Sequence, residues 1–445
     1  MASGFLRRRV LRVELTSLRS EGIYCGILHI FCCFNGIDNM NENSDIDYAK
    51  ELIRLCRAGR LHDIDRLISE GKSLDISNAM KRGRQRSLVE VAVETGFHSL
   101  IELIARNEPS QSAKDAALGL AVSSRRLDIV ELLLVNGADI KAVPLVDVLL
   151  TWEPVLIRFF LDHGADPVNG RPFAEAFGAK VRTALRAFID YKRAHPELAA
   201  QLQEQIDCAL RHFCFAGDLK WVSLLMWAGA DPRSRGPKLE EEYTEDPECY
   251  TSGLEEACYS EDPDVLKRLK PDASRDNLAE LLHQAAFWGR SVMLEYLLGI
   301  GAVPNDKING GSSALDSALR NLSFIRITAY TTGKPSSQYD ARQTFDCVRE
   351  LLSHGAIWSP DSAYELNSLR RALLECEPDV TIELLQLFRK HCACPAETVH
   401  KLLGTPRMRE HMKSEANALL RLGIHLEDRP NSIWRRSPRR IGAGR

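Results

Sequence analysis

The chain has 445 residues, of which 44% are hydrophobic and 27% are charged, and its formal net charge is −3 at pH 7. This composition is typical of a folded globular protein, and a charge so close to zero excludes a general attraction to nucleic acid or to an anionic membrane. The 12 cysteines are scattered without the dense spacing of a secreted disulfide scaffold. They favour reduced thiols in a cytoplasmic protein.

Residues 1–39 differ from the rest of the sequence. They contain Arg7-Arg8-Arg9 and one apolar run, Ile23–Phe34. A signal peptide or a membrane anchor is the alternative, but this run is well short of the roughly 20 apolar residues that span a bilayer, and no small-residue cleavage site follows it. From Met40 the sequence MNENSDIDYAKELI leads into a capped helix. We therefore expect residues 1–39 to be a disordered or non-native extension.

The rest of the chain is organised around Leu127–Ala142, LDIVELLLVNGADIKA. Its apolar residues recur at helical spacing and predict a broad buried stripe: Ile129, Val130, Leu132, Leu133 and Leu134. Asn136-Gly137 then ends the helix, because glycine adopts the left-handed conformation at low cost. A helix this short is not stable alone, so it requires similar neighbours on both sides.

Such neighbours are present, and they carry a resemblance. The signature recurs at Phe159–Pro167 (FFLDHGADP), Leu224–Pro232 (LLMWAGADP), Tyr296–Pro304 (YLLGIGAVP) and Leu351–Pro360 (LLSHGAIWSP). The chain here resembles the ankyrin-repeat family, whose second helix ends in a leucine run followed by G-A-D. The family's first-helix motif, T-P-L-H-x-A-A, is matched at Glu280–Ala286 and more weakly at Ser313–Ala318 and Ser252–Cys258. The resemblance implies an all-α, ankyrin-like solenoid of about ten stacked helix-turn-helix repeats.

The repeat array is expected to span residues 40–427. Its predicted helix pairs are 48–58 with 61–69, 88–94 with 99–105, 113–123 with 128–135, 145–150 with 155–162, a departing unit at 171–196, 198–213 with 220–227, 254–259 with 265–270, 277–288 with 292–298, 314–322 with 342–353, 366–374 with 380–390, and 396–403 with 414–422. In the second of these pairs, Leu88, Ala92, Leu100 and Leu103 are predicted to face inward.

Two insertions and a tail interrupt this plan. One insertion lies near residues 233–250 and carries the acidic stretch Glu240–Glu248, which is either a solvated loop or a contact for a basic partner. The other is a polar loop near 321–341. Residues 428–445 form a basic tail, rich in proline and arginine and predicted to be disordered.

The sequence contains no nucleotide-binding loop, zinc-protease motif or nucleophile elbow. His391, Cys392, Cys394, Cys376 and His400 have the right types for zinc, but they lack the paired spacing of a structural site. His283 occupies the position where the resemblance implies a histidine that bonds the neighbouring loop, and no nucleophile accompanies it within the motif. We therefore predict no catalytic residue, no cofactor and no metal.

Large aromatic residues follow the small pair that ends the first helix. Phe287 and Trp288 follow Ala285-Ala286. We assign Phe215 to the equivalent place in another unit and Trp152 to that of the short unit. The resemblance implies that these positions face the concave groove, where aromatic residues act as interface anchors. The alternative is that Trp288 covers a gap between uneven repeats.

These features together predict a non-catalytic scaffold that binds another protein through its concave face. One alternative is a regulatory or sensor subunit that controls a separate enzyme, such as a toxin or defence nuclease. Another is a nucleic-acid adaptor acting through Arg7–Arg9 and the basic tail, but aromatic interleaving there amounts to Trp434 alone, which argues against it.

Overall fold

The computed structural model describes residues 35–76, 86–239, 250–308, 311–332, 341–359, 361–376, 378–392, 402 and 406–412. Within these ranges the protein is all-α, with two isolated antiparallel bridges and no strand. Several segments singled out in the sequence lie outside the described residues: Ile23–Phe34, Glu240–Glu248 and the tail after residue 428. The chain divides into two compact units.

The first unit comprises Met1–Leu120 and Asp128–Ala138. Its helices are α1 (Asn35–Arg57), α2 (Leu61–Ser69), α3 (Leu88–Thr95), α4 (His98–Asn107), α5 (Gln111–Ser123, which runs into the second unit) and α6 (Leu127–Val135). The first helix of one pair packs on the first helix of the next pair, as α1 packs on α3. The second helices pack on each other in the same way, as α2 packs on α4. Helix α1 begins at Asn35, before the predicted helix start at residue 48 and before Met40, where the array was expected to begin.

Local signals in the sequence explain where these helices begin and end. Helix α3 starts with a capping box, in which the Ser87 hydroxyl accepts from the Glu90 amide and the Glu90 carboxylate accepts from the Ser87 amide. It ends at Gly96, whose φ is +73°. Capping therefore satisfies amides that a short helix would otherwise leave unpaired.

The core of the first unit confirms most of the predicted inward positions. Leu88, Ala92 and Leu100 are buried, and Leu133 is 1% exposed. The predicted stripe of α6 was too broad, because only Ile129, Val130 and Leu133 are buried, whereas Leu132 and Leu134 are half-buried. Leu103 is also half-buried, since Ile104 faces the core in its place. Neighbouring residues therefore bury only one face of a helix as short as α6.

The second unit comprises Ala121–Leu127 and Asp139–Arg445. Its α-helices are α7 (Leu145–Leu149), α8 (Pro154–Asp162), α9 (Pro172–Gly178), α10 (Arg182–Ala194), α11 (Ala199–Ala216), α12 (Leu219–Trp227), α13 (Gly253–Ala257), α14 (Pro263–Leu269), α15 (Leu278–Phe287), α16 (Ser291–Gly299), α17 (Ala314–Thr332), α18 (Ala341–Ser353), α19 (Ala363–Glu375), α20 (Pro378–His391) and α22 (Pro406–His411). Short 3₁₀ turns lie at Ile140–Ala142 and Pro196–Leu198.

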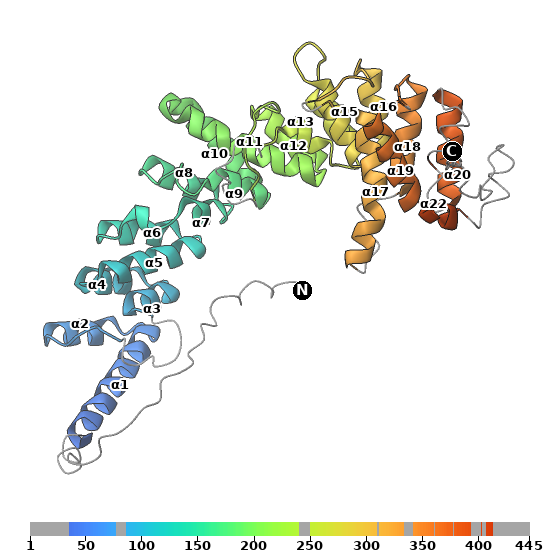
Figure 1. Cartoon of the computed structure of the whole chain (residues 1–445). Coiled ribbons are helices and arrows are strands. Elements are labelled where there is room, and N and C mark those ends of the chain that lie inside the picture. The colour runs from blue at the N-terminus through green and yellow to red at the C-terminus, as the bar shows by residue number, and fades with distance from the viewer. Residues whose placement is uncertain are drawn as a thin grey trace, which may run out of the picture. The chain divides into compact units, whose positions relative to one another are not determined.

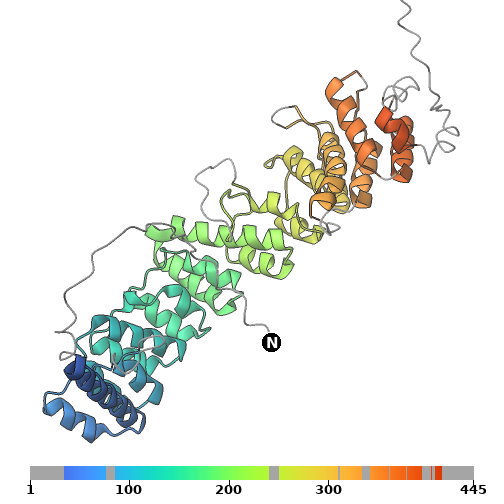
Figure 2. The ribbon, with the colours of Figure 1, turned by 60° about the horizontal axis from the view of Figure 1, so that its bottom comes forward.

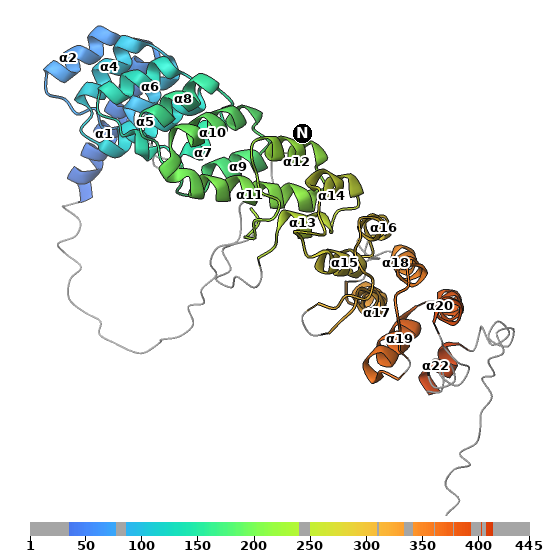
Figure 3. The ribbon, with the colours of Figure 1, turned by 90° about the horizontal axis from the view of Figure 1, so that it is seen from above.

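Two rows of helices build this unit (Figures 1 and 2). The first row runs α7, α9, α11, α13, α15, α17, α19, each helix packed on the next. In the second row α12, α14, α16, α18 and α20 pack in the same way, as does α8 on α10. Figure 3 shows α14, α16, α18 and α20 on one side and α13, α15, α17 and α19 on the other. The unit is thus a solenoid fold of repeated helix pairs, as the sequence predicted.

The G-A-D signature has a structural reason that both units share. After several second helices a glycine takes a positive φ, as at Gly137, Gly164 and Gly229. The alanine that follows is buried, as at Ala165, and its amide donates to a helix carbonyl five residues back. Glycine therefore allows the chain to turn, and the alanine amide caps a carbonyl at the end of the helix.

Buried polar side chains tie successive units together. The two ring nitrogens of His283 lie 2.8 Å from the Ser317 hydroxyl and 2.8 Å from the Ser312 carbonyl. This confirms the structural role expected for His283. Burial lowers its pKa, so the ring is held neutral. Gln205 acts similarly in another unit, accepting from the Phe173 amide and donating to the Pro167 carbonyl.

The predicted loop at 321–341 begins too early. Helix α17 continues to Thr332, and α18 starts at Ala341. In the sequence, no glycine or proline follows residue 322 until Gly333 and Pro335, so nothing stops the helix sooner. Helix α22 falls between the two segments predicted to form the last pair.

Candidate functional site

Three first-row helices of the second unit bring aromatic rings together at their C-terminal ends. Phe215 lies near the end of α11, Tyr259 follows α13, and Trp288 caps α15. The ring centroids of Phe215 and Tyr259 are 5.5 Å apart, and those of Tyr259 and Trp288 are 4.7 Å apart. Phe287 meets Trp288 edge-on at 5.2 Å. We call these four side chains the aromatic ladder.

The ladder is partly open to solvent. Phe215 is 47% exposed, whereas Tyr259, Phe287 and Trp288 are half-buried. Burial is the main cause that raises the pKa of Tyr259 to about 12, and the negative charge of Glu256 adds to it. The phenol is therefore neutral at any physiological pH, so the ladder presents uncharged aromatic surface.

A cation lies against the ladder. Lys238 comes from the insertion after α12, and its Nζ is 4.5 Å from the centroid of the Phe215 ring and 5.8 Å from that of Tyr259. The same Nζ is 3.4 Å from a carboxylate oxygen of Glu256, a side chain that is fully buried. An ammonium held over ring faces and beside a carboxylate is stabilised by both.

Trp152 does not belong to the ladder, and its assignment to the position of Trp288 was wrong. The Trp152 amide donates to the Leu149 carbonyl, as the Gly289 amide donates to that of Ala286. Trp152 has a φ of +67° and Gly289 a φ of +69°. Trp152 therefore occupies the place of the turn glycine. It is 42% exposed, and within the described residues no other ring contacts it.

Sequence reasoning also missed two members of the site. Tyr259 follows the small pair Ala257-Cys258, just as Phe287 follows Ala285-Ala286, so the same rule would have found it. Lys238 lies in an insertion with no repeat counterpart, and no sequence signal connects it to Phe215. Only the folded chain shows that contact.

Burial makes several cysteines of the described residues poor nucleophiles. None of the seven cysteines in the described residues forms a disulfide, and burial raises the pKa of Cys56 to about 12 and that of Cys214 and Cys258 further. Protonated buried thiols are poor nucleophiles. No group of three potential metal ligands occurs within the described residues. Of the zinc candidates, Cys394 and His400 lie outside them.

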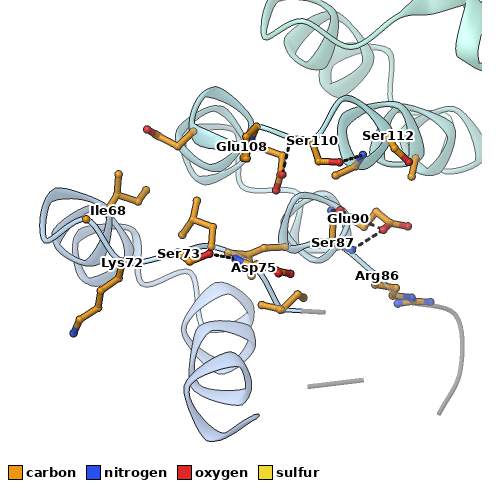
Figure 4. A pocket seen from close by; sticks show the side chains of 18 residues that line it. Ile68, Lys72, Ser73, Asp75, Arg86, Ser87, Glu90, Glu108, Ser110 and Ser112 are labelled. Atoms are coloured by element: carbon orange, nitrogen blue, oxygen red, sulfur yellow. Dashed lines mark hydrogen bonds between the residues drawn. The ribbon is translucent and has the colours of Figure 1, made fainter. Parts of the chain in front are cut away.

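The first unit contains an open hollow of about 790 Å³ between its loops (Figure 4). The hydroxyls that line it are engaged locally: Ser73 accepts from the Asp75 amide, Ser87 caps α3 and Ser110 accepts from the Ala113 amide. These three hydroxyls therefore serve to cap turns and helix ends, and none of them carries a ligand site in the described part of the hollow.

Comparison with known proteins gives a structural similarity and no sequence match. No family model matches the chain, and no curated protein matches it in sequence. Among solved structures it is similar to the ankyrin repeat domain of Bcl-3, described as a unique member of the IkappaB protein family, with 18% identity. The match covers 59% of this chain and 91% of that one, with a TM-score of 0.28, and carries no argument about what either binds.

The class of the protein follows from its own features. Helix pairs stack in rows, G-A turns close the second helices, and a buried histidine bonds the next loop. The chain is an ankyrin-like repeat protein. None of the helices in its described part is long and apolar enough to cross a membrane.

Proposed function

We propose that the protein is a non-catalytic, cytoplasmic scaffold that binds another protein through the concave face of its repeats, with the aromatic ladder as an anchor. The observation that supports it most directly is the contact of Phe215, Tyr259 and Trp288 across three consecutive units, with Phe215 still 47% exposed. Aromatic residues clustered on a rigid scaffold and partly open to solvent are typical of interface hot spots.

Trp152 supports a second anchor on the same array. A bulky residue with positive φ is strained, by about 1–2 kcal/mol. Leu150 and Val155, which flank it in sequence, are also exposed. Strain retained at an exposed aromatic residue is a reason to infer function there.

Partner capture tests the proposal. The full chain and a Phe215→Ala/Trp288→Ala double variant are compared as baits under identical conditions. A partner retained by the native chain and lost by the double variant is the expected result. Trp227→Ala is the matched control, because Trp227 is 70% exposed at the end of α12 and lies outside the ladder. Equal capture by the double variant and the native chain contradicts the proposal.

The same experiment addresses the alternative that the chain regulates a separate enzyme. In that case the protein lost by the double variant is an enzyme, and its activity changes on adding the native chain but not the double variant. A captured protein whose activity is unaffected, or one with no activity, leaves plain scaffolding as the function.

A further inference from the structure

A hollow in the second unit is lined by polar side chains from two consecutive first-row helices and the loop before them. It has a volume of about 460 Å³, and its walls are the loop at 307–313, the first two turns of α17 and the first turn of α19. We call it the loop pocket. None of its lining residues belongs to the aromatic ladder, so it is a separate feature of the repeats.

The loop wall of this pocket is held in place by hydrogen bonds. Lys307 and Ser313 form an antiparallel bridge, and the Ile308 amide donates to the Ser312 carbonyl at 3.2 Å. The same carbonyl lies 2.8 Å from Nε2 of the buried His283, in the preceding repeat. Because the wall is tied to itself and to its neighbour, little ordering is required when a ligand binds.

Three donors in the loop pocket have hydrogens to spare. Arg320 donates from Nη2 to the Tyr364 hydroxyl at 3.0 Å, and within the described residues its other guanidinium N–H groups have no acceptor. Since this bond uses a lone pair of the Tyr364 oxygen, the phenolic hydrogen stays available for donation. The ammonium of Lys307 is exposed and forms no ion pair in the described part of the chain.

Two carboxylates also line the pocket, and backbone amides engage both. Asp316 is 5% exposed and accepts from the amide and the hydroxyl of Ser313 at 3.0 and 2.9 Å. Glu365 is half-buried and accepts from the Ser359 amide at 2.6 Å. Each acid also lies in the first turn of a helix, where the positive end of the helix dipole offsets its charge. The two cations are more exposed than either carboxylate.

A further donor lies in the loop wall. The Ser312 hydroxyl is buried and has no hydrogen-bond partner within the described residues. A buried hydroxyl without a partner is destabilising, because it has lost its hydrogen bonds to water. Since Ser312 lines the loop pocket, a ligand oxygen that enters the pocket can supply the missing acceptor.

We propose that the loop pocket is a binding site for an oxyanion, that is, a carboxylate or a phosphate group. The guanidinium of Arg320 has the planar fork that fits two oxygens of such a group, and Lys307 and Tyr364 add donors. A cationic ligand would be repelled, and a neutral one would leave both cations without a counter-charge. The oxyanion is either a free small anion or a side chain of the ladder's partner. The second source rests on the proposed function, and the first does not.

The first test uses inorganic phosphate and acetate as probes of the full-length chain, at constant ionic strength. Either anion should slow hydrogen exchange in the first turns of α17 and α19 several-fold and in a saturable way, because a ligand that binds the folded pocket opposes its local opening. Arg320→Gln should lose this protection. No protection by either anion, or protection fully retained in Arg320→Gln, overturns the proposal.

Matched variants separate binding in the pocket from a general effect of charge. Lys220→Gln removes one exposed positive charge at the start of α12, outside the pocket, and should respond as the native chain does. Arg320→Lys keeps the charge without the fork and should respond more weakly than the native chain. Lys307→Gln, at an exposed loop position, replaces Arg320→Gln if that variant does not fold. Equal loss of protection in Lys220→Gln overturns the proposal.

The second test identifies the source of the oxyanion, using the partner recovered by ladder-dependent capture. If the partner supplies it, Arg320→Gln should retain several-fold less partner than the native chain, and Lys220→Gln should retain as much. Native-like retention by Arg320→Gln, together with the phosphate or acetate response, assigns the pocket to a free anion. An anion response without any ladder-dependent partner supports the pocket and overturns the proposed function. A ladder-dependent partner without an anion response does the reverse.

Discussion

The turns at Trp152 and Gly289 have the same backbone conformation, but the space around them differs. Both have φ near +70° and the same amide-to-carbonyl bond. At Gly289 the next repeat packs so closely that a β-carbon would lie 2.5 Å from the Thr344 hydroxyl oxygen, so glycine is required. The turn at Trp152 holds an exposed indole instead. Tight packing therefore requires glycine at position 289, whereas the open turn at position 152 accommodates a large side chain in a strained conformation.

Two other turns with a non-glycine residue at positive φ make side-chain contacts with the next turn. Arg125 and Lys180 also have positive φ, and their side chains reach acids of the next turn: Arg125 lies 3.8 Å from Glu153, and Lys180 lies 2.7 Å from Asp218. Trp152 makes no comparable contact within the described residues, which is why we assign its role to a partner.

The comparison requires that turns in different repeats respond independently, and a core substitution tests this with the largest expected effect. Leu133→Ala should cost about 2–5 kcal/mol through lost burial and the cavity left behind. In a repeat array the damage stays near the substitution. Hydrogen exchange should therefore rise around α6 and in the neighbouring repeats and stay unchanged at the distant turn of Gly289. A uniform rise along the chain would show that the turns are coupled.

The steric half of the comparison is tested at Gly289. Gly289→Ala should lower the unfolding free energy by about 2–5 kcal/mol, the sum of left-handed strain of about 1–2 kcal/mol and overpacking of about 1–3 kcal/mol. Gly164→Ala is the matched control, because its φ is +85° and nothing lies near its β-carbon. It should show the strain alone in denaturant melts. Equal costs at both sites would remove the argument that packing requires Gly289.

The functional half of the comparison is tested at the neighbouring residue. Trp288→Ala should weaken partner binding by about 2–4 kcal/mol, roughly 30- to 1000-fold, while changing the melting temperature little. Affinity and thermal unfolding are measured on the same variant. If Trp288 only fills a gap between repeats, stability falls strongly and affinity is unchanged, and that outcome ends the anchor hypothesis.

A smaller effect is expected at Trp152. Trp152→Gly should be more stable than Trp152→Ala by about 1 kcal/mol, since glycine relieves the left-handed strain that alanine retains. Both variants should weaken partner binding to a similar extent, because both lose the indole. Unchanged affinity in the two variants would leave Trp152 as a tolerated residue with no role in binding.

The smallest effect concerns pH and is expected at His283, in the repeat of Gly289. Burial is the main cause that lowers the pKa of His283 below the ordinary value of about 6.5. Below that pH the unfolded chain binds a proton that the folded chain does not, so stability falls as the pH drops from about 6.5 toward the folded-state pKa. Urea melts of the native chain and of His283→Gln should differ in this slope. A slope retained in His283→Gln assigns the pH dependence to another group.

The fold was predictable from the sequence because its determinants are local. The boundaries of α2 agree with the predicted 61–69, since Arg60 and Gly71 flank a short apolar repeat that nothing else interrupts. His283 and Leu133 also lie where their motifs placed them. Errors arose where a boundary lacked a breaker, as at α17, or where a non-glycine residue took the turn position, as at Trp152.

The sequence by itself determined the helix pairs, the turns between them and the residue types available for anchoring, because helical spacing and glycine turns act within a few residues. Only the tertiary structure decided which aromatic residues meet. It brought Phe215, Tyr259 and Trp288 together from three repeats and laid Lys238 over them. Such contacts depend on the stacking of whole repeats and on an insertion outside the repeat pattern, so no local signal specifies them.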